Sequence, residues 1–156
     1  MTEEVRRRGI LTLEIVGAWV KRAWGPFYRG WLVTRELSGA HDLWAALGSH
    51  LYVGEDGMCL LRSVAQSLRR MHGRGVYHRD LNLKNILVRR EKDGIRSYII
   101  DFDKARLFSE EVPPKKAERN LNRLLRSVCK LDPERRRLSR EDWDLFLRFY
   151  REASNG

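Results

Sequence analysis

The sequence predicts one α+β domain, in which an N-terminal β-hairpin precedes a mostly helical C-terminal part. The chain has 156 residues, which is enough for a single hydrophobic core. Its hydrophobic content of 42% and its five Trp are typical of a folded protein rather than a disordered one. Apolar residues alternate with polar ones near the start and recur every three or four positions in several later segments, which indicates strands followed by helices.

Two strands are predicted near the N-terminus. Residues 10–20 alternate partly between apolar and polar side chains, and residues 27–37 predict a second strand. Trp24-Gly25-Pro26 indicates the turn that joins them, and Ser38-Gly39 breaks the second strand. We therefore expect a β-hairpin over residues 10–37.

Four helices are predicted after the hairpin. Residues 42–51 indicate a short helix, and residues 58–71 carry an amphipathic stripe that ends before Gly73. A third stripe runs over residues 117–128. The last helix begins at Ser139, because an acidic residue three places later resembles an N-terminal cap. The Met and Leu residues of these stripes are expected to form the core rather than a cofactor site.

The charge favours anionic partners. The net charge is +10 at neutral pH, so phosphates, nucleic acid or an acidic membrane surface would be attracted. The run at residues 135–137 contains three consecutive Arg, and a solvated turn and a contact with anionic lipid explain it equally well. No helix-turn-helix, zinc-finger or RNP signature is present, so we expect no nucleic-acid partner.

The cysteine usage and the apolar runs bear on location. Cys59 and Cys129 fit no metal-binding spacing and are expected to be reduced packing thiols, which suits the cytoplasm. No secretory signal is visible, and no stretch approaches the roughly 20 apolar residues that a membrane span needs. Any membrane contact is therefore expected to be peripheral.

The stretch at residues 77–85, Y-H-R-D-L-N-L-K-N, carries the chemistry. Asp80 and Asn85 precede an apolar strand, and a second apolar strand ends at Asp101-Phe102-Asp103. This order is the one used for phosphoryl transfer: one carboxylate accepts the proton of the acceptor hydroxyl, and an Asn and a second Asp hold Mg²⁺. An ordinary helix–turn–strand with solvated polar residues is the alternative, which the spacing and the flanking strands disfavour. His78 is expected to be a structural imidazole beneath this loop.

These residues resemble the protein kinases and one branch of their superfamily in particular. Protein kinases usually carry Lys two places after the catalytic Asp and Gly at the end of D-F-G, whereas this chain has Asn82 and Asp103. H-x-D-L-N-x-x-N followed by I-D-F-D-K resembles the bacterial lipopolysaccharide kinases, especially Kdo kinases, which phosphorylate a sugar of the lipopolysaccharide inner core. Residues 119–127 also resemble that family's downstream helix. The resemblance covers roughly residues 27–130.

The resemblance implies a protein-kinase-like fold with a remnant hairpin of the N-terminal lobe. Residues 1–37 would be a partial N-terminal lobe and hinge, and residues 38–156 the C-terminal lobe. It also implies ATP and Mg²⁺ as cofactors and a lipid-linked sugar as substrate. The enzyme would act at an anionic membrane surface, as a cytoplasmic protein that is peripheral on the inner face of the inner membrane.

The same resemblance assigns roles to individual residues. The catalytic set is Asp80, Asn85 and Asp101. The metal ligands are Asn85, Asp101 and, with a weaker basis, Asp103. The residues that would contact the nucleotide lie in the hinge, in the loop and on the floor beneath adenine, and are Glu36, Leu37, Asn82, Leu87 and Ile100.

Two features expected of a kinase are missing from the sequence. No G-x-G-x-x-G occurs and no V-A-I-K-like strand precedes the hairpin. We therefore expect either that more sequence lies upstream or that the chain is a natural remnant, and that it alone binds ATP weakly and tends to associate through the edge of the hairpin. A catalytically inactive pseudokinase or binding module remains an alternative. A protein Ser/Thr kinase is another, although Asn82, Asp103 and the lack of A-P-E disfavour it.

Overall fold

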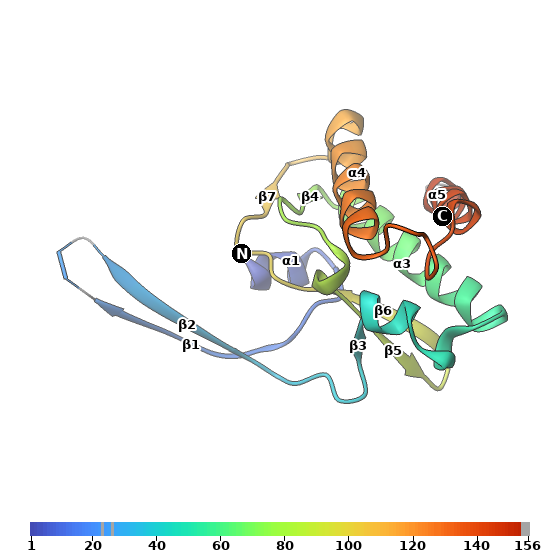
Figure 1. Ribbon diagram of the computed structural model, residues 1–156. Helices are drawn as coiled ribbons and strands as arrows, with labels where there is room; N and C mark the ends of the chain where they lie inside the picture. The colour runs from blue at the N-terminus through green and yellow to red at the C-terminus, as the bar shows by residue number, and fades with distance from the viewer. Residues whose placement is uncertain (23, 26, 154–156) are drawn as a thin grey trace.

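The computed structural model describes residues 1–22, 24–25 and 27–153. A β-hairpin projects from a body that contains the helices and the remaining short strands (Figure 1). In chain order the elements are α1 (Thr2–Arg7), β1 (Ile15–Arg22), β2 (Tyr28–Thr34), β3 (His41–Asp42), α2 (Leu43–Leu47), η1 (His50–Tyr52), α3 (Glu55–Gly73), β4 (Val76–Tyr77), η2 (Leu83–Asn85), β5 (Ile86–Glu91), β6 (Gly94–Ile99), β7 (Arg106–Leu107), α4 (Pro114–Leu131) and α5 (Arg140–Glu152).

The predicted hairpin is confirmed. β1 and β2 pair antiparallel, with Trp19 opposite Trp31. At the base, the Arg35 N–H donates to the Glu14 carbonyl oxygen at 2.8 Å, and their side chains form an ion pair at 2.9 Å. The large apolar side chains of the hairpin are exposed, Trp24 to 90%. Pro26 of the predicted turn lies outside the described residues.

The first eleven residues pack against the body rather than extending the hairpin. Val5 of α1 and Ile10 are buried in the core, and the Leu11 carbonyl oxygen accepts from the Ile99 N–H at 3.0 Å. The Arg8 guanidinium donates to the carbonyl oxygen of Phe108 at 2.7 Å. β1 therefore begins at Ile15, later than the predicted strand start, because the preceding residues belong to the body. The division of the chain at residue 37 stays a prediction.

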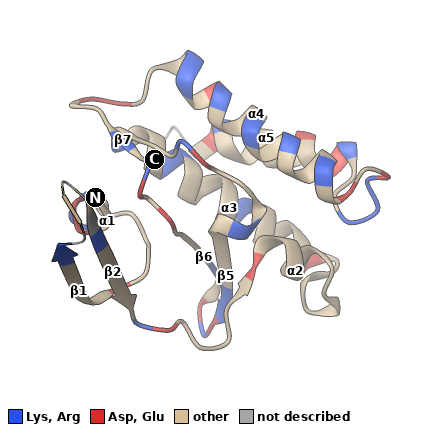
Figure 2. Ribbon diagram, turned by 60° about the vertical axis from the view of Figure 1, so that its left-hand side comes forward, with Lys and Arg blue, Asp and Glu red and all other residues tan. Residues whose placement is uncertain are grey.

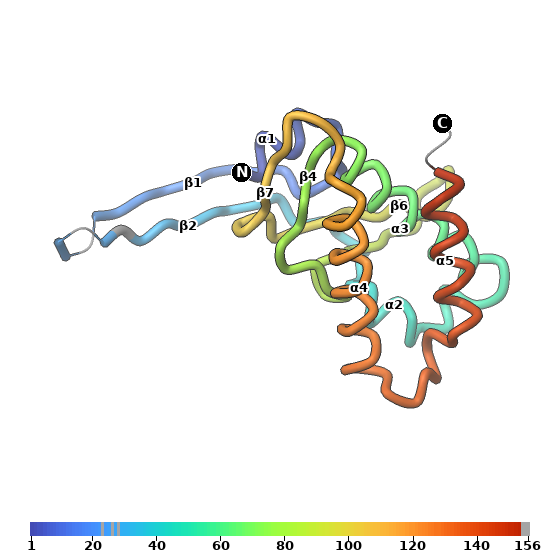
Figure 3. The backbone as a smooth tube through the Cα atoms, turned by 90° about the horizontal axis from the view of Figure 1, so that it is seen from above, coloured from blue at the N-terminus to red at the C-terminus, as the bar shows by residue number. Residues whose placement is uncertain are grey.

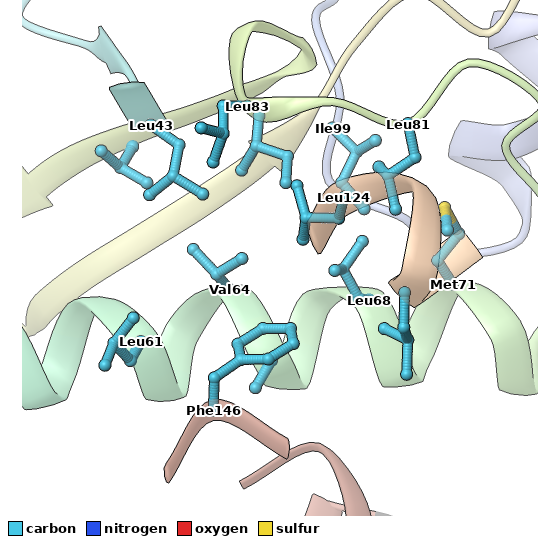
Figure 4. Close-up of a cluster of buried hydrophobic side chains, with 14 of the residues drawn as sticks. Leu43, Leu61, Val64, Leu68, Met71, Leu81, Leu83, Ile99, Leu124 and Phe146 are labelled. Carbon is cyan, nitrogen blue, oxygen red and sulfur yellow. The ribbon is translucent and has the colours of Figure 1, made fainter. Parts of the chain in front are cut away.

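Helix α3 forms the centre of the body. Its buried side chains recur every three or four residues, and they contact the loop at residues 77–85 and β6 on one side and α5 on the other (Figure 4). Glu55 and Asp56 lie in its first turn, where carboxylates interact favourably with the helix dipole. The helix begins three residues before the predicted range of 58–71 and ends two residues after it, at Gly73.

Two small sheets hold the loop between α3 and β5. β3, β5 and β6 form one antiparallel sheet, in which Ile86 lies opposite Ile99. β4 and β7 form a two-residue pair. The apolar strands predicted after Asn85 and before Asp101 are confirmed as β5 and β6, and both strands extend toward their shared turn. The predicted helix over residues 42–51 forms as α2 followed by the short 3₁₀ helix η1.

Of the last two helices, α5 packs against α3, whereas α4 contacts β4 and η2 (Figure 3). α5 begins with the predicted cap, because Ser139 and Asp142 bond each other's backbone N–H reciprocally. The basic run before α5 has partners within the chain. Arg137 lies 3.9 Å over the Trp44 ring, and Arg136 pairs with Glu134.

Candidate active site

The loop at residues 77–85, which we call the catalytic loop for the role predicted of it, is anchored by apolar side chains and presents polar ones. Leu81 and Leu83 are fully buried, whereas Asp80, Asn82 and Asn85 between and beside them are partly exposed. The loop is also held from α4, where the Ser127 hydroxyl accepts the Leu83 N–H at 3.0 Å. The polar side chains are therefore aimed outward by the burial of their neighbours.

Asp80 lies at the surface of the loop, with half of its side chain exposed. A guanidinium nitrogen of Arg123 on α4 lies 3.8 Å from its carboxylate. The bonds that shape the loop use the Asp80 backbone instead. Its carbonyl oxygen accepts from the side-chain amides of Asn82 at 3.0 Å and of Asn85 at 2.9 Å. The Asp80 carboxylate is thus free to contact a substrate.

Asn85 and Asp101 are brought together by the pairing of β5 with β6. The Ile100 N–H donates to the Asn85 carbonyl oxygen at 3.0 Å, so the residue that follows Ile100 emerges beside Asn85. The Asn85 amide nitrogen is bonded to the loop, and its Oδ1 has no hydrogen-bond partner among the described residues. Asp101 is exposed and has the left-handed backbone with φ of 63°. An amide oxygen and an exposed carboxylate are hard oxygen ligands of the kind Mg²⁺ takes, so the pair fits this ion.

Asp103, the weaker metal candidate, is exposed in the turn that follows Phe102. Within the described residues, no cluster of three or more His, Cys, Asp or Glu could hold a metal. A metal at this place would therefore depend on Asn85, together with water and phosphate oxygens, as is usual for Mg²⁺. The roles of Asn85, Asp101 and Asp103 as ligands stay predictions.

His78 is buried beneath the loop as a neutral imidazole. Its Nδ1 accepts the Asp80 N–H at 3.2 Å, so the proton is on Nε2, which donates to the Ile100 carbonyl oxygen at 2.9 Å. Burial lowers its pKa. Its ring packs against the fully buried Phe102, with ring centroids 5.0 Å apart. His78 therefore ties the loop to the strand end at Asp101, which is the structural role expected of it.

A second buried network joins three helices to the loop. The Asn120 side chain on α4 donates to the His78 carbonyl oxygen at 2.7 Å and accepts the His78 N–H at 3.2 Å. The same amide oxygen lies 3.1 Å from His72 Nε2 on α3, and His72 Nδ1 lies 2.7 Å from the Tyr150 hydroxyl on α5. Because Asn120 Oδ1 only accepts, His72 is the Nε2–H tautomer, and Tyr150 donates to it. Burial lowers the pKa of His72 to about 4.

Four of the five residues predicted to contact the nucleotide lie outside the loop, either between β2 and β3 or on the β5–β6 hairpin. Glu36 is exposed and Leu37 half-buried in the segment between β2 and β3, where the Leu37 carbonyl oxygen already accepts the Ala40 N–H at 3.1 Å. Leu87 and Ile100 are half-buried on the β5–β6 hairpin.

Asn82 has both ends of its side chain engaged within the loop. Its oxygen accepts the Lys84 N–H at 2.9 Å, and its nitrogen donates to the Asp80 carbonyl oxygen. These bonds give Asn82 a part in shaping the loop. The nucleotide contacts of all five residues remain predictions.

Sequence reasoning missed the α4 residues that contact the loop. Asn120, Arg123 and Ser127 lie about 40 residues after their partners, so no local spacing relates them. Two signals were available: the resemblance of residues 119–127 to the downstream helix of the lipopolysaccharide kinases, and the polarity of positions on a helical stripe. Neither indicates contact with the loop.

The fold and the loop together define the C-terminal lobe of the protein-kinase-like fold. A solved structure described as WaaP in complex with acyl carrier protein superimposes with a TM-score of 0.73 and 23% identity, covering 97% of this chain and 65% of that one. The chain belongs to the lipopolysaccharide kinase (Kdo/WaaP) family, which it matches over residues 1–150.

Two curated relatives are both described as 3-deoxy-D-manno-octulosonic acid kinase. The Pasteurella multocida protein is 30% identical over 151 residues, which cover 96% of this chain and 60% of that protein. The Vibrio vulnificus (strain CMCP6) protein is 32% identical over 130 residues, which cover 83% of this chain and 50% of that protein. The chain thus spans about half to 60% of the length of these relatives.

Proposed function

We propose that this chain is the catalytic part of an ATP- and Mg²⁺-dependent kinase that phosphorylates a sugar hydroxyl, that of Kdo, in the lipopolysaccharide inner core. One observation carries the proposal. The exposed Asp80 carboxylate, the unbonded Asn85 oxygen and the exposed Asp101 carboxylate emerge from one loop and the adjoining strand end. The family supports the acceptor, because its relatives are named for kinase activity on this sugar acid.

Asp80 would act as the general base. Its carboxylate would accept the proton of the sugar hydroxyl as the hydroxyl oxygen attacks the terminal phosphorus of ATP. The bond from that phosphorus to the bridging oxygen would break, and ADP would leave. Arg123, 3.8 Å away, would hold the carboxylate in place and offset its charge. Asn85 and Asp101 would hold Mg²⁺, which would neutralise the charge of the nucleotide phosphates. Asn82 and His78 contribute by keeping the loop in the shape that presents Asp80.

The proposed place of action is the inner face of the inner membrane, where a lipid-linked sugar would be met by a peripheral enzyme. No helix in the described part of the chain is both long and apolar enough to cross a bilayer. The net charge of +10 supports attraction to an anionic surface.

The test is transfer of labelled phosphate from ATP to a Kdo-bearing lipid by the chain and its Asp80→Asn variant. Loss of the base should slow transfer by about 10²–10⁴-fold. Asp144→Asn, an exposed carboxylate on α5, is the matched control and should keep wild-type activity. Equal transfer by Asp80→Asn would remove Asp80 from the role of base.

Calorimetry of ATP binding with and without Mg²⁺ tests the metal site through Asp101→Asn. We expect the Mg²⁺-dependent part of the affinity to fall, because the amide oxygen of Asn can occupy the same place but lacks the negative charge of the carboxylate. If Mg²⁺-dependent ATP binding is present while no transfer occurs to the lipid, the chain is a binding module and the proposed reaction is wrong.

A further inference from the structure

Helix α4 concentrates its positive charge on one face. At 3.6 residues per turn, each residue advances the helix by about 100°, so its six cations fall within an arc of about 100°. We call this set the α4 cationic face, and its members are Lys115, Lys116, Arg119, Arg123, Arg126 and Lys130. Figure 2 shows Lys and Arg recurring along this helix. The opposite side of the helix carries the buried residues, such as Leu121, Leu124 and Val128.

Most of these cations have no partner in the described part of the chain. Lys115, Arg119, Arg126 and Lys130 make no ion pair or hydrogen bond there, whereas many other Arg residues pair with a carboxylate, as Arg89 does with Glu91. Six like charges on one helical face repel one another, and nothing described on this face compensates four of them. Such an arrangement is typical of a surface that binds an anion.

The face lies directly beside the catalytic loop. Arg123 is 3.8 Å from the Asp80 carboxylate, and Lys116 lies 5.9 Å from the Tyr77 ring centroid. Next to these positions, Ser127 bonds the loop backbone at Leu83. One long edge of the cationic face therefore lies beside Asp80, where the acceptor hydroxyl is proposed to bind. The remainder of the face extends away from the loop on the solvent side.

The length of the face decides the class of ligand. Its first and last cations are fifteen residues apart, which is about 22 Å at 1.5 Å per residue. A single phosphate would occupy only one end, and a nucleotide held at Asn85 and Asp101 would leave most of the face unused. A ligand with several acidic groups spread over more than one sugar unit would match it.

We propose that the α4 cationic face binds the carboxylate and phosphate groups of an acidic glycolipid acceptor and so places its hydroxyl at Asp80. The inference rests on the proposed function for the identity of the site, but it concerns acceptor binding and not the chemical step. Arg119, Arg126 and Lys130 would hold acidic groups remote from the reacting sugar, and Arg123 would lie between these groups and the base.

The experiment measures binding of the full chain to vesicles in the absence of ATP. One set contains phosphatidylcholine with a Kdo-bearing lipid A precursor, and a second contains phosphatidylcholine with phosphatidylglycerol at the same surface charge. The test variant is Arg119→Glu/Arg126→Glu. The control variant, Arg148→Glu/Arg151→Glu, makes the same charge change at exposed positions of α5. Circular dichroism checks that each variant is folded.

We expect wild type to bind the Kdo-lipid vesicles several-fold more tightly than the phosphatidylglycerol vesicles. Because each cation near an anionic surface contributes about fivefold in affinity, removal of two cations costs about 25-fold, and the two added carboxylates increase the loss. The test variant should therefore lose at least about 25-fold on the Kdo-lipid vesicles, and the control variant much less. Equal binding of the two vesicle types, or equal losses in the two variants, would overturn acceptor recognition by α4 and leave only general attraction to a membrane. Failure of the proposed reaction would look different, since α4-dependent binding would persist without phosphate transfer.

Discussion

Lowering the pH should destabilise the fold through His72, well before most carboxylates are protonated. This side chain is 1% exposed, and it accepts a hydrogen bond from Tyr150 on Nδ1 while donating to Asn120 from Nε2. Protonation would place a second N–H on Nδ1, facing the Tyr150 hydroxyl, and would bury a charge. Burial accordingly lowers the pKa of His72 from 6.5 to about 4.

The sign and size of the effect follow from linkage. Between the folded and unfolded pKa values the unfolded chain binds more protons, so the free energy of unfolding falls as the pH falls. The contribution is fully present above the unfolded value of 6.5 and is lost as the pH decreases toward about 4. Integration from about pH 8 to about pH 5 gives a loss of about 2 kcal/mol from this one group.

The assay is urea unfolding of wild type and His72→Gln at these two pH values, followed by circular dichroism. The variant will be less stable at the higher pH, because it leaves a cavity and loses a hydrogen bond. Its stability should nevertheless fall by about 2 kcal/mol less on acidification than that of wild type. His78 and the carboxylates are present in both proteins, so their contributions cancel. Parallel losses in the two proteins would refute the assignment of the pH dependence to His72.

Two further predictions use matched pairs of variants. Gly75→Ala should lower the free energy of unfolding by about 3 kcal/mol, because a positive φ is combined with a methyl group 2.6 Å from the Phe108 carbonyl oxygen. Gly39→Ala has the positive φ alone and should lower it by about 1 kcal/mol. Thermal unfolding distinguishes them, and equal costs would contradict the steric argument. Asn120→Ala should cost about 3 kcal/mol or more, since it leaves buried backbone groups of the loop unpaired, while Asn122→Ala on the exposed side should change the stability by under about 0.5 kcal/mol. A mild effect of Asn120→Ala would mean that water replaces its bonds.

Elements that carry a sustained apolar repeat or a local capping pattern could be predicted from the sequence. The stripe of α3 and the cap of α5 at Ser139 depend on residues within a few positions of one another. The short helix α1 could not be predicted, because six residues with one buried side chain, Val5, carry no clear period. The paired strands β4 and β7 were missed for the same reason, since each has two residues.

The residues of the candidate site also fall into those that could be predicted from the sequence and those that could not. Asp80, Asn85 and Asp101 could be chosen from the sequence because their order follows a known pattern, and their roles stay predictions. The groups that hold the loop are distant in sequence. Asn120 contacts His78 across 42 residues, and Arg123 approaches Asp80 across 43. Such partners are set by how α4 packs on the body, which depends on the whole core rather than on any motif.

The hydrogen bonds separate the residues that shape the site from those proposed to react in it. The loop is held by the side chains of Asn82, His78 and Asn120, together with backbone groups, whereas the one contact of the Asp80 carboxylate among the described residues is a 3.8 Å ion pair. Loss of activity in Asp80→Asn would therefore report on chemistry and not on folding. The choice of substitution matters at Asp101, because its φ of 63° is a conformation that Asn and Asp adopt more readily than Ala. Replacement by Ala would add roughly 1 kcal/mol of backbone strain at the strand end, so only the Asn variant isolates the metal contact.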